Sequence, residues 1–224
     1  MSLNIKVYFD FVCPFCFLGE ETLSKAIEGK DVNIQWMPFE LRPEPSPRID
    51  PWRETEKLNA WNNFIEPVAK NLKIDMKLPK ISPHPYTNLA FEGYHYVNNM
   101  GKGEEYIRRV FKGFFQEGLD IGKIEILANL SEEIGLNKEE FIKVLKNRKY
   151  KDNQEKVLKH AYEEANITAV PTMIIGDEVV HGNTSKENLE EIINKLTFED
   201  FAVAMIDEIE TPKHIKSRFT VAYK

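Results

Sequence analysis

The chain has 224 residues, a formal net charge of −6 and a hydrophobic fraction of 42%. This length is enough for a substantial core, and no apolar run approaches the length of a membrane span. The acidic balance provides no basic face for nucleic acid. We therefore expect an ordinary soluble enzyme that has neither a nucleic-acid partner nor a membrane association.

The first predicted elements are a strand and a helix that flank the only two cysteines of the chain. The alternating run Ile5–Phe9 is typical of a strand, and residues 17–27 carry apolar side chains at helical spacing. Cys13-Pro14-Phe15-Cys16 lies between them, where the strand ends and the helix begins. Because no secretory signal precedes the strand, we expect a cytoplasmic protein in which disulfides are transient.

A Cys-Pro-x-Cys pair at the start of a helix predicts redox chemistry. The unpaired N–H groups and the dipole of a helix N-terminus favour a thiolate, which can lower a cysteine pKa from about 8.5 to between about 3.5 and 7.5. Pro14 suits the first helical position. We expect Cys13 to be an exposed nucleophile that attacks a substrate disulfide, and Cys16 to resolve the mixed disulfide.

A zinc site is the main rival for the cysteine pair. It would need two further ligands from the five histidines, and no two of these have the close spacing of a zinc half-site. We therefore expect no metal and no bound cofactor other than the redox-active disulfide. Asp10, three residues before Cys13, would oppose a thiolate if its carboxylate pointed inward, but we expect it to face solvent or to cap a turn.

The middle of the chain is helical in pattern from about residue 52 to residue 165, after a proline-rich loop over residues 41–51. An apolar stripe at helical spacing predicts core positions, of which one or two aromatic side chains near Cys13 would line a groove. The stripe consists of Tyr106, Ile107, Val110, Phe111, Phe114 and Phe115. His84 lies in a second proline cluster, and we expect it in a surface loop, with a role near the cysteines as the alternative.

Residues 168–180 predict a loop, a strand, a tight turn at Gly176-Asp177 and a second strand. Ser185 then suits the N-cap of a final helix that runs through Lys195. The tail, residues 198–224, contains a helix candidate at 198–206 and a strand candidate at 219–223. This tail packs on its own core, reaches a second subunit to form a homodimer, or covers the active site, and the sequence leaves these three open.

The chain resembles the DsbA family of thiol-disulfide oxidoreductases, which have a thioredoxin fold, and most resembles its FrnE-like branch. The resemblance covers residues 4–196. It is carried by Phe9–Cys16, Val170-Pro171-Thr172, Pro38–Pro43 and the stretch from Tyr106 to Phe141.

This resemblance implies an α/β thioredoxin-like fold with a large all-helical insertion between an N-terminal βαβ unit and a C-terminal ββα unit. The implied division is a discontinuous thioredoxin-like domain at residues 1–40 and 166–197, a helical insertion domain at 41–165 and a C-terminal extension at 198–224.

The resemblance also implies how substrate is held. Pro171 is expected to follow a cis peptide bond beside the cysteine pair, and the Val170 backbone to contact the substrate, together with Pro14 and Phe15. The implied partners are protein or small-molecule disulfides and thiols, including glutathione. Phe15 stands where strongly oxidising DsbA enzymes typically carry histidine, so we expect a mid-range reduction potential and a reductase or isomerase.

Two other functions remain open. Kappa-class glutathione transferases and 2-hydroxychromene-2-carboxylate isomerases share the architecture, but they typically place serine at the position of Cys13. A thioredoxin-like binding or chaperone module would need no cysteine chemistry at all, and fold alone does not establish function.

Overall fold

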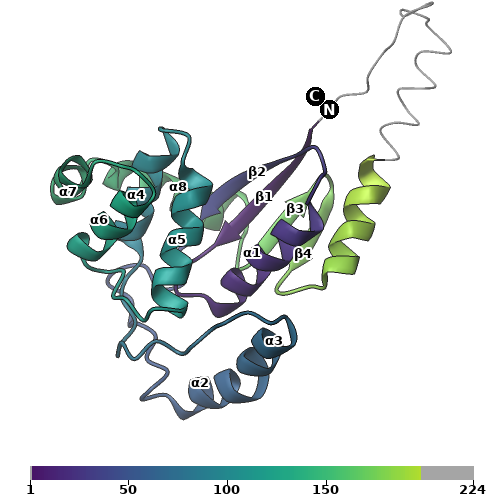
Figure 1. The fold of residues 1–224 in the computed structure, drawn as a ribbon, viewed down its shortest axis with the longest axis horizontal. Helices are drawn as coiled ribbons and strands as arrows, with labels where there is room; N and C mark the ends of the chain where they lie inside the picture. The colour runs from purple at the N-terminus through teal and green to yellow at the C-terminus, as the bar shows by residue number, and fades with distance from the viewer. Residues whose placement is uncertain (1, 198–224) are drawn as a thin grey trace, which may run out of the picture.

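The computed structural model describes residues 2–197, and its centre is a four-stranded sheet with the order β2-β1-β3-β4 (Figure 1). The strands are β1 (Leu3–Phe9), β2 (Val32–Pro38), β3 (Thr172–Ile175) and β4 (Glu178–His181). β1 and β2 are parallel and are joined by a helix, whereas β3 is antiparallel to both β1 and β4. The predicted βαβ and ββ units are therefore confirmed.

The helices between β2 and β3 form most of the remaining structure. The helical elements are α1 (Pro14–Ala26), α2 (Thr55–Ala60), the π-helical turn η1 (Trp61–Ile65), α3 (Glu66–Asn71), α4 (Asn88–Asn98), α5 (Gly103–Phe115), α6 (Ile124–Glu133), α7 (Lys138–Lys146), α8 (Lys151–Lys159) and a second π-helical turn, η2 (His160–Glu164). Residues 186–197 form a final helix. Within residues 2–197, no helix is both long and apolar enough to cross a bilayer.

The predicted fold class is confirmed by this element order, whereas the division into domains stays a prediction. The helix and strand candidates of the tail, and its three possible roles including a homodimer, concern residues 198–224, which lie outside the described residues. The cap predicted at Ser185 is present, since its hydroxyl accepts from the Asn188 N–H at 3.2 Å. Asn137 caps α7 in the same way, its side chain accepting from the Glu140 N–H at 2.9 Å.

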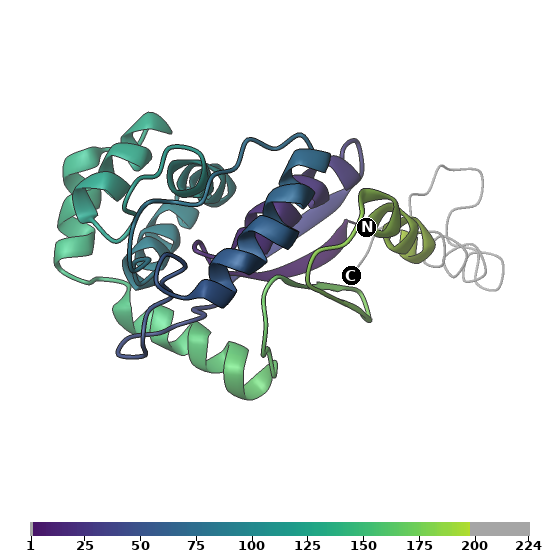
Figure 2. The same ribbon diagram turned by 90° about the horizontal axis from the view of Figure 1, so that it is seen from below.

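The sheet is covered on both faces near the carboxyl end of β1. Alternate residues from Leu3 to Phe9 belong to the main core, which also contains the buried face of α1. Tyr8 points the other way, into a smaller cluster with Phe39, Ala161 and Ile167. Helix α8 and η2 therefore cover the second face at this end, and Figure 2 shows them on the side of the sheet away from α1.

Helix α1 is anchored to α5 by an aromatic stack and by an ion pair. The Phe17 and Phe115 rings stack with centroids 5.6 Å apart and planes inclined by 7°. The buried Glu20 carboxylate accepts from the Arg108 Nε at 2.7 Å. The predicted stripe on α5 is confirmed as core, because all six of its residues are at most 1% exposed. These contacts hold the helix that begins at the cysteine pair.

Candidate active site

Cys13 occupies the N-cap of α1, and Pro14 follows at the first helical position. The Cys13 carbonyl oxygen accepts from the N–H groups of Cys16 and Phe17, at 3.1 and 3.3 Å. The Cys13 N–H in turn donates to the Asp10 carbonyl oxygen at 3.1 Å, which closes the turn between β1 and α1. The cysteine pair thus lies at the predicted junction, and both cysteines are free thiols.

The expectation that Cys13 is exposed is wrong. Cys13 is 4% exposed and Cys16 is 3% exposed. Cys13 instead lines a cavity of about 350 Å³, whose opposite wall comes from α2, η1 and the segments around them. Figure 1 shows α2 and α3 beneath the end of α5. Cys13 is therefore approached through the cavity and not from an open surface.

The loop before β3 meets the cysteine pair. The Val170–Pro171 peptide bond is cis, and the Cys13 Sγ donates to the Val170 carbonyl oxygen at 3.5 Å. The Thr172 hydroxyl steadies this loop by donating to the Ala169 carbonyl oxygen at 2.8 Å. The chain therefore brings together residues that are 157 positions apart.

The predicted site residues divide into two groups. Cys13, Pro14, Phe15 and Val170 all line the cavity, whereas Cys16 and Pro171 are not among its lining residues. Phe115, from the stripe on α5, also lines the cavity, as expected for an aromatic side chain at the edge of that stripe.

Asp10 points into the protein, so the expectation that it faces solvent is wrong. It is 1% exposed, and its carboxylate accepts from the Leu41 N–H at 2.7 Å and from the Val12 N–H at 3.4 Å. The alternative, that Asp10 caps the turn before Cys13, is confirmed by these bonds. Burial raises the pKa of Asp10 to about 6, although the hydrogen bonds to its carboxylate oppose the shift.

Cys16 is held in an environment that favours the thiol over the thiolate. Burial raises the pKa of Cys16 well above its usual value, and the neighbouring Cys13 adds to the shift. The negative charge of Asp10 acts in the same direction, whereas a hydrogen bond from the Asp10 backbone acts against it. Ionisation of Cys16 therefore requires a group that takes its proton.

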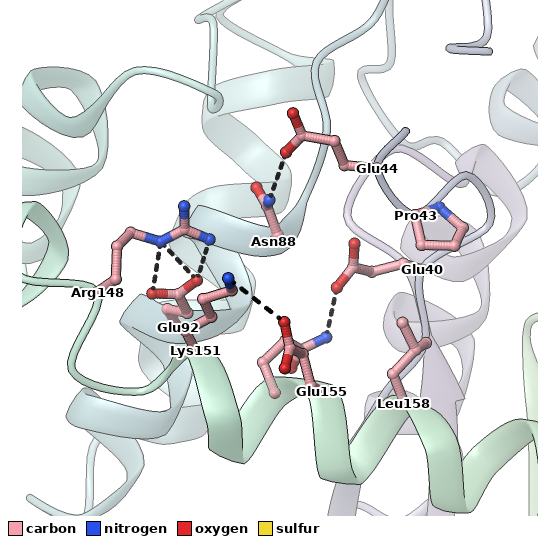
Figure 3. Close-up of a pocket in the computed structure, with 10 residues that line it drawn as sticks. Glu40, Pro43, Glu44, Asn88, Glu92, Arg148, Lys151, Glu155 and Leu158 are labelled. Atoms are coloured by element: carbon pink, nitrogen blue, oxygen red, sulfur yellow. Dashed lines mark hydrogen bonds and ion pairs between the residues drawn. The ribbon is translucent and has the colours of Figure 1, made fainter. Parts of the chain in front are cut away.

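A second buried carboxyl, Glu40, connects the surroundings of Asp10 to a polar pocket (Figure 3). Gln154 donates to the Glu40 Oε1 at 2.8 Å, and Arg148 binds Glu92 through two nitrogens on the same pocket wall. Burial raises the pKa of Glu40 to about 7, and the charge of Asp10 contributes to the shift. The pocket has a volume of about 300 Å³ and gives Glu40 a route to solvent that does not pass Cys13.

Sequence patterns alone misplace two residues near the cysteines, Asp10 and His84, and they do not single out Glu40. Asp10 and Glu40 both follow strands that are parallel and end in register at Phe9 and Pro38. Acidic residues just beyond the ends of two parallel strands share one sheet edge, and this signal was available. His84 is 4% exposed and lines the Cys13 cavity, so the surface-loop expectation is wrong, and no local pattern indicates its burial.

Comparison with known proteins gives a family match over most of the chain. The family model described as a DSBA-like thioredoxin domain matches residues 4–194. The uncharacterized protein YwbO of Bacillus subtilis (strain 168) is 52% identical over 194 residues, which cover 87% of this chain and 97% of that protein. A 2-hydroxychromene-2-carboxylate isomerase of Pseudomonas putida is 24% identical over 200 residues, which cover 86% of this chain and 95% of the isomerase.

Solved structures show the same fold. A structure described as a probable DsbA oxidoreductase from Streptomyces coelicolor has a TM-score of 0.75 at 19% identity, and the match covers 87% of this chain and 89% of the other. The cytosolic disulfide reductase DsbM from Pseudomonas aeruginosa, solved with GSH, has a TM-score of 0.65 at 13% identity, with 90% and 100% covered.

We predict that Glu40 makes the protein less stable as the pH rises. Its folded-state pKa of about 7 lies above the ordinary value of 4.5, so the folded state binds the proton more tightly. Its contribution to stability is complete below about pH 4.5 and is lost as the pH rises through about 7. Glu40→Gln should therefore gain about 2–3 kcal/mol in free energy of unfolding relative to wild type between pH 4.5 and pH 8, measured by urea denaturation.

The matched control is Glu44→Gln, because Glu44 lines the same pocket but is exposed. Its effect should stay within about 0.5 kcal/mol at both pH values. A Glu40→Gln effect that is the same at pH 4.5 and pH 8 would show that the raised pKa is wrong.

Proposed function

Because the chain belongs to the DSBA-like thioredoxin domain family, we propose that it is a thiol-disulfide oxidoreductase with Cys13 as nucleophile and Cys16 as resolving cysteine. One observation carries this proposal: Cys13 caps α1 with its Sγ beside the Val170 carbonyl oxygen, on the wall of a cavity.

The proposed reaction has two thiol-disulfide exchanges. The Cys13 thiolate attacks one sulfur of a substrate disulfide, a Cys13–substrate disulfide forms, and the other substrate sulfur leaves as a thiolate that takes up a proton. Cys16 then loses its proton and attacks the Cys13 sulfur, which releases the second substrate thiol. The substrate gains two electrons, and the protein is left with a Cys13–Cys16 disulfide.

Asp10 is proposed to take the proton from Cys16 in the second exchange. The two groups are close enough for the Asp10 charge to raise the Cys16 pKa, and Asp10 is itself shielded from solvent. With a pKa of about 6, Asp10 is ionised at neutral pH and therefore able to accept a proton. Glu40, whose pKa is raised partly by Asp10, would pass that proton toward the polar pocket.

The loop at Pro171 is proposed to position the substrate. The Val170 carbonyl oxygen that accepts from the Cys13 thiol would bind the backbone of a peptide or of glutathione, while Pro14 and Phe15 contact the group next to the substrate sulfur. Glutathione is also proposed to reduce the Cys13–Cys16 disulfide, with two molecules oxidised to glutathione disulfide. A fold shared with a cytosolic reductase solved with GSH supports this partner and a cytoplasmic location.

A second candidate is a glutathione-using isomerase. The relative that is 24% identical and named 2-hydroxychromene-2-carboxylate isomerase supports it. An isomerase of this kind would not need Cys16, whereas the proposed oxidoreductase depends on both cysteines. A mixed disulfide trapped in the Cys16 variant therefore supports the oxidoreductase, and its absence supports the isomerase.

We predict that Cys16→Ser accumulates a mixed disulfide between Cys13 and the substrate. The first exchange needs only Cys13, but without Cys16 nothing inside the protein releases the second substrate thiol. Incubation with glutathione disulfide followed by intact-protein mass spectrometry should show one glutathione per chain, and Cys13→Ser should show none. Adducts of equal yield in both variants would rule out Cys13 as the nucleophile.

We predict that Asp10→Asn slows the second exchange by about ten- to a hundred-fold at pH 7, because a general base near the thiol is removed. In the wild type the rate of this step should rise as the pH passes about 6, the folded-state pKa of Asp10. Stopped-flow measurement of mixed-disulfide decay from pH 5 to pH 8 tests the profile. The matched control is Asp50→Asn, which changes another buried carboxylate, one that the Ser82 hydroxyl binds. A pH profile of Asp10→Asn that still rises near pH 6 would contradict the role of Asp10 as the base.

We predict a mid-range reduction potential, near the −200 to about −230 mV of glutaredoxins, since the apolar Phe15 offers no hydrogen bond to stabilise the Cys13 thiolate. Equilibration in glutathione buffers followed by thiol trapping measures it. A value above about −140 mV would identify an oxidant and overturn the proposed reductase or isomerase direction.

A further inference from the structure

Two arginines of the proline-rich loop, Arg42 and Arg48, form no ion pair within residues 2–197. The other four arginines in this part of the chain each bind a carboxylate, and they are Arg53, Arg108, Arg109 and Arg148. Arg42 donates to the Leu41 carbonyl oxygen at 3.0 Å, and the Arg48 guanidinium lies over the Tyr86 ring, 5.4 Å from its centroid. Both residues are exposed, so most of their N–H donors are available to a ligand.

Both arginines line a second pocket, which lies beside the Cys13 cavity. This pocket has a volume of about 670 Å³, and it shares Leu41, Ile49 and Lys57 with the wall of the cavity. The cavity itself, at about 350 Å³, lies at the lower end of the range for sites that enclose small organic molecules. A larger substrate with its sulfur at Cys13 must therefore extend beyond the cavity, and the second pocket adjoins it at these three residues.

The second pocket is positively charged, although the chain as a whole carries a net charge of −6. Arg42, Arg48 and Lys57 line it, and Glu54 is the one acidic residue among its lining residues. The Glu54 carboxylate already accepts from a backbone N–H at 2.9 Å and lies 3.9 Å from the Lys57 Nζ. The cavity wall, by contrast, carries one acidic and one basic residue, Glu56 and Lys57. Selection by charge therefore belongs to the second pocket, which we call the basic pocket.

We propose that the basic pocket binds a carboxylate of the disulfide substrate, several bonds away from the sulfur that Cys13 attacks. The planar N–H groups of a guanidinium match the two oxygens of a carboxylate. An ammonium group would be repelled at the same place, and an uncharged group would gain no charge-assisted hydrogen bond. The inference rests on the proposed function, because it specifies which disulfides Cys13 reacts with.

Two kinds of disulfide carry such a carboxylate. Each half of glutathione disulfide has a glycyl carboxylate with no ammonium group beside it, unlike the carboxylate of its γ-glutamyl end. In a peptide, an acidic side chain near the cysteine provides the same group. The recognition chemistry is the same for both sources, and the experiment distinguishes them.

The test uses two pairs of disulfides, and the members of each pair differ only in that carboxylate. The first pair is glutathione disulfide and the disulfide of glutathione glycyl ethyl ester. The second pair consists of the symmetric disulfides of two acetylated and amidated tripeptides, cysteinyl-glycyl-glutamate and cysteinyl-glycyl-glutamine. The second-order rate constant of each is measured with fully reduced protein under single-turnover conditions, by the thiol released.

The quantity compared is the ratio of the rate constant of the carboxylate compound to that of its uncharged partner. In the double variant Arg42→Gln, Arg48→Gln this ratio should fall by about five-fold relative to wild type, as expected for the loss of two partly exposed charge pairs. The intrinsic reactivities of the compounds cancel when the ratios of two proteins are compared. Because both arginines are exposed, the double variant should unfold within a few degrees of wild type.

Arg53→Gln is the matched control, because Arg53 is an exposed arginine of the neighbouring segment that does not line the basic pocket. It removes the same charge and should leave both ratios unchanged. Salt provides a second readout, since about 1 M NaCl shortens the Debye length to about 3 Å. The ratio should fall with salt in the wild type and change much less in the double variant.

The possible results separate this inference from the proposed function. A ratio that falls for only one pair supports the inference and identifies the source of the carboxylate, glutathione or a peptide. If neither ratio falls, or if Arg53→Gln lowers the ratios equally, the basic pocket does not bind the substrate and the inference is overturned while the oxidoreductase stands. If no disulfide reacts with Cys13, the proposed function fails and the inference fails with it.

Discussion

The Asp10 carboxylate is the contact on which the geometry of the cysteine turn depends. It accepts from the Val12 N–H inside the turn and from the Leu41 N–H just after β2, so it joins the start of α1 to the neighbouring strand. The Cys13 N–H donates to the carbonyl oxygen of the same residue. Cys13 therefore sits at a helix N-cap whose position these contacts tie to the sheet. From there its sulfur reaches the Val170 carbonyl oxygen, on a loop that is remote in sequence.

The same contact has an electrostatic cost that suits the proposed chemistry. A carboxylate buried for structural reasons also raises the pKa of the Cys16 thiol, so Cys16 resists ionisation until its proton is taken away. Burial raises the pKa of Asp10 itself to about 6, which brings a structural group into the range where proton transfer is efficient. Asp10 thus disfavours the Cys16 thiolate at rest and, under the proposed function, accepts the Cys16 proton when the thiol reacts. The polar pocket beyond Glu40 would complete the arrangement by exchanging the proton with solvent on the side away from the substrate.

Much of the framework followed from local patterns, but the surroundings of the sulfur did not. The strand before Cys13, the helix after it and the hairpin after Pro171 are each specified by a few consecutive residues, and all were predicted. The approach of Val170 to Cys13 was implied only by family resemblance, since no local rule brings together positions 157 residues apart. The exposure of Cys13, Asp10 and His84 was misjudged for one reason: it depends on which segments cover them. Periodicity identifies a buried face, but it does not say that α2 and η1 will lie over the N-terminus of α1.

The cavity wall has two separate origins in the chain. The turn at residues 12–15 and Val170 provide the sulfur and the groups around it, whereas most of the remaining wall comes from residues 41–84. These two parts meet at the cavity but belong to different stretches of sequence. Leu41 is the exception, because its N–H holds the Asp10 carboxylate. Substitutions at residues 49–84 can alter the shape and polarity of the cavity while the cysteine turn keeps its own contacts. Under the proposed function, substrate range and electron transfer can therefore change independently, and an engineer can graft a new 49–84 segment to change what is accepted without redesigning the cysteine turn.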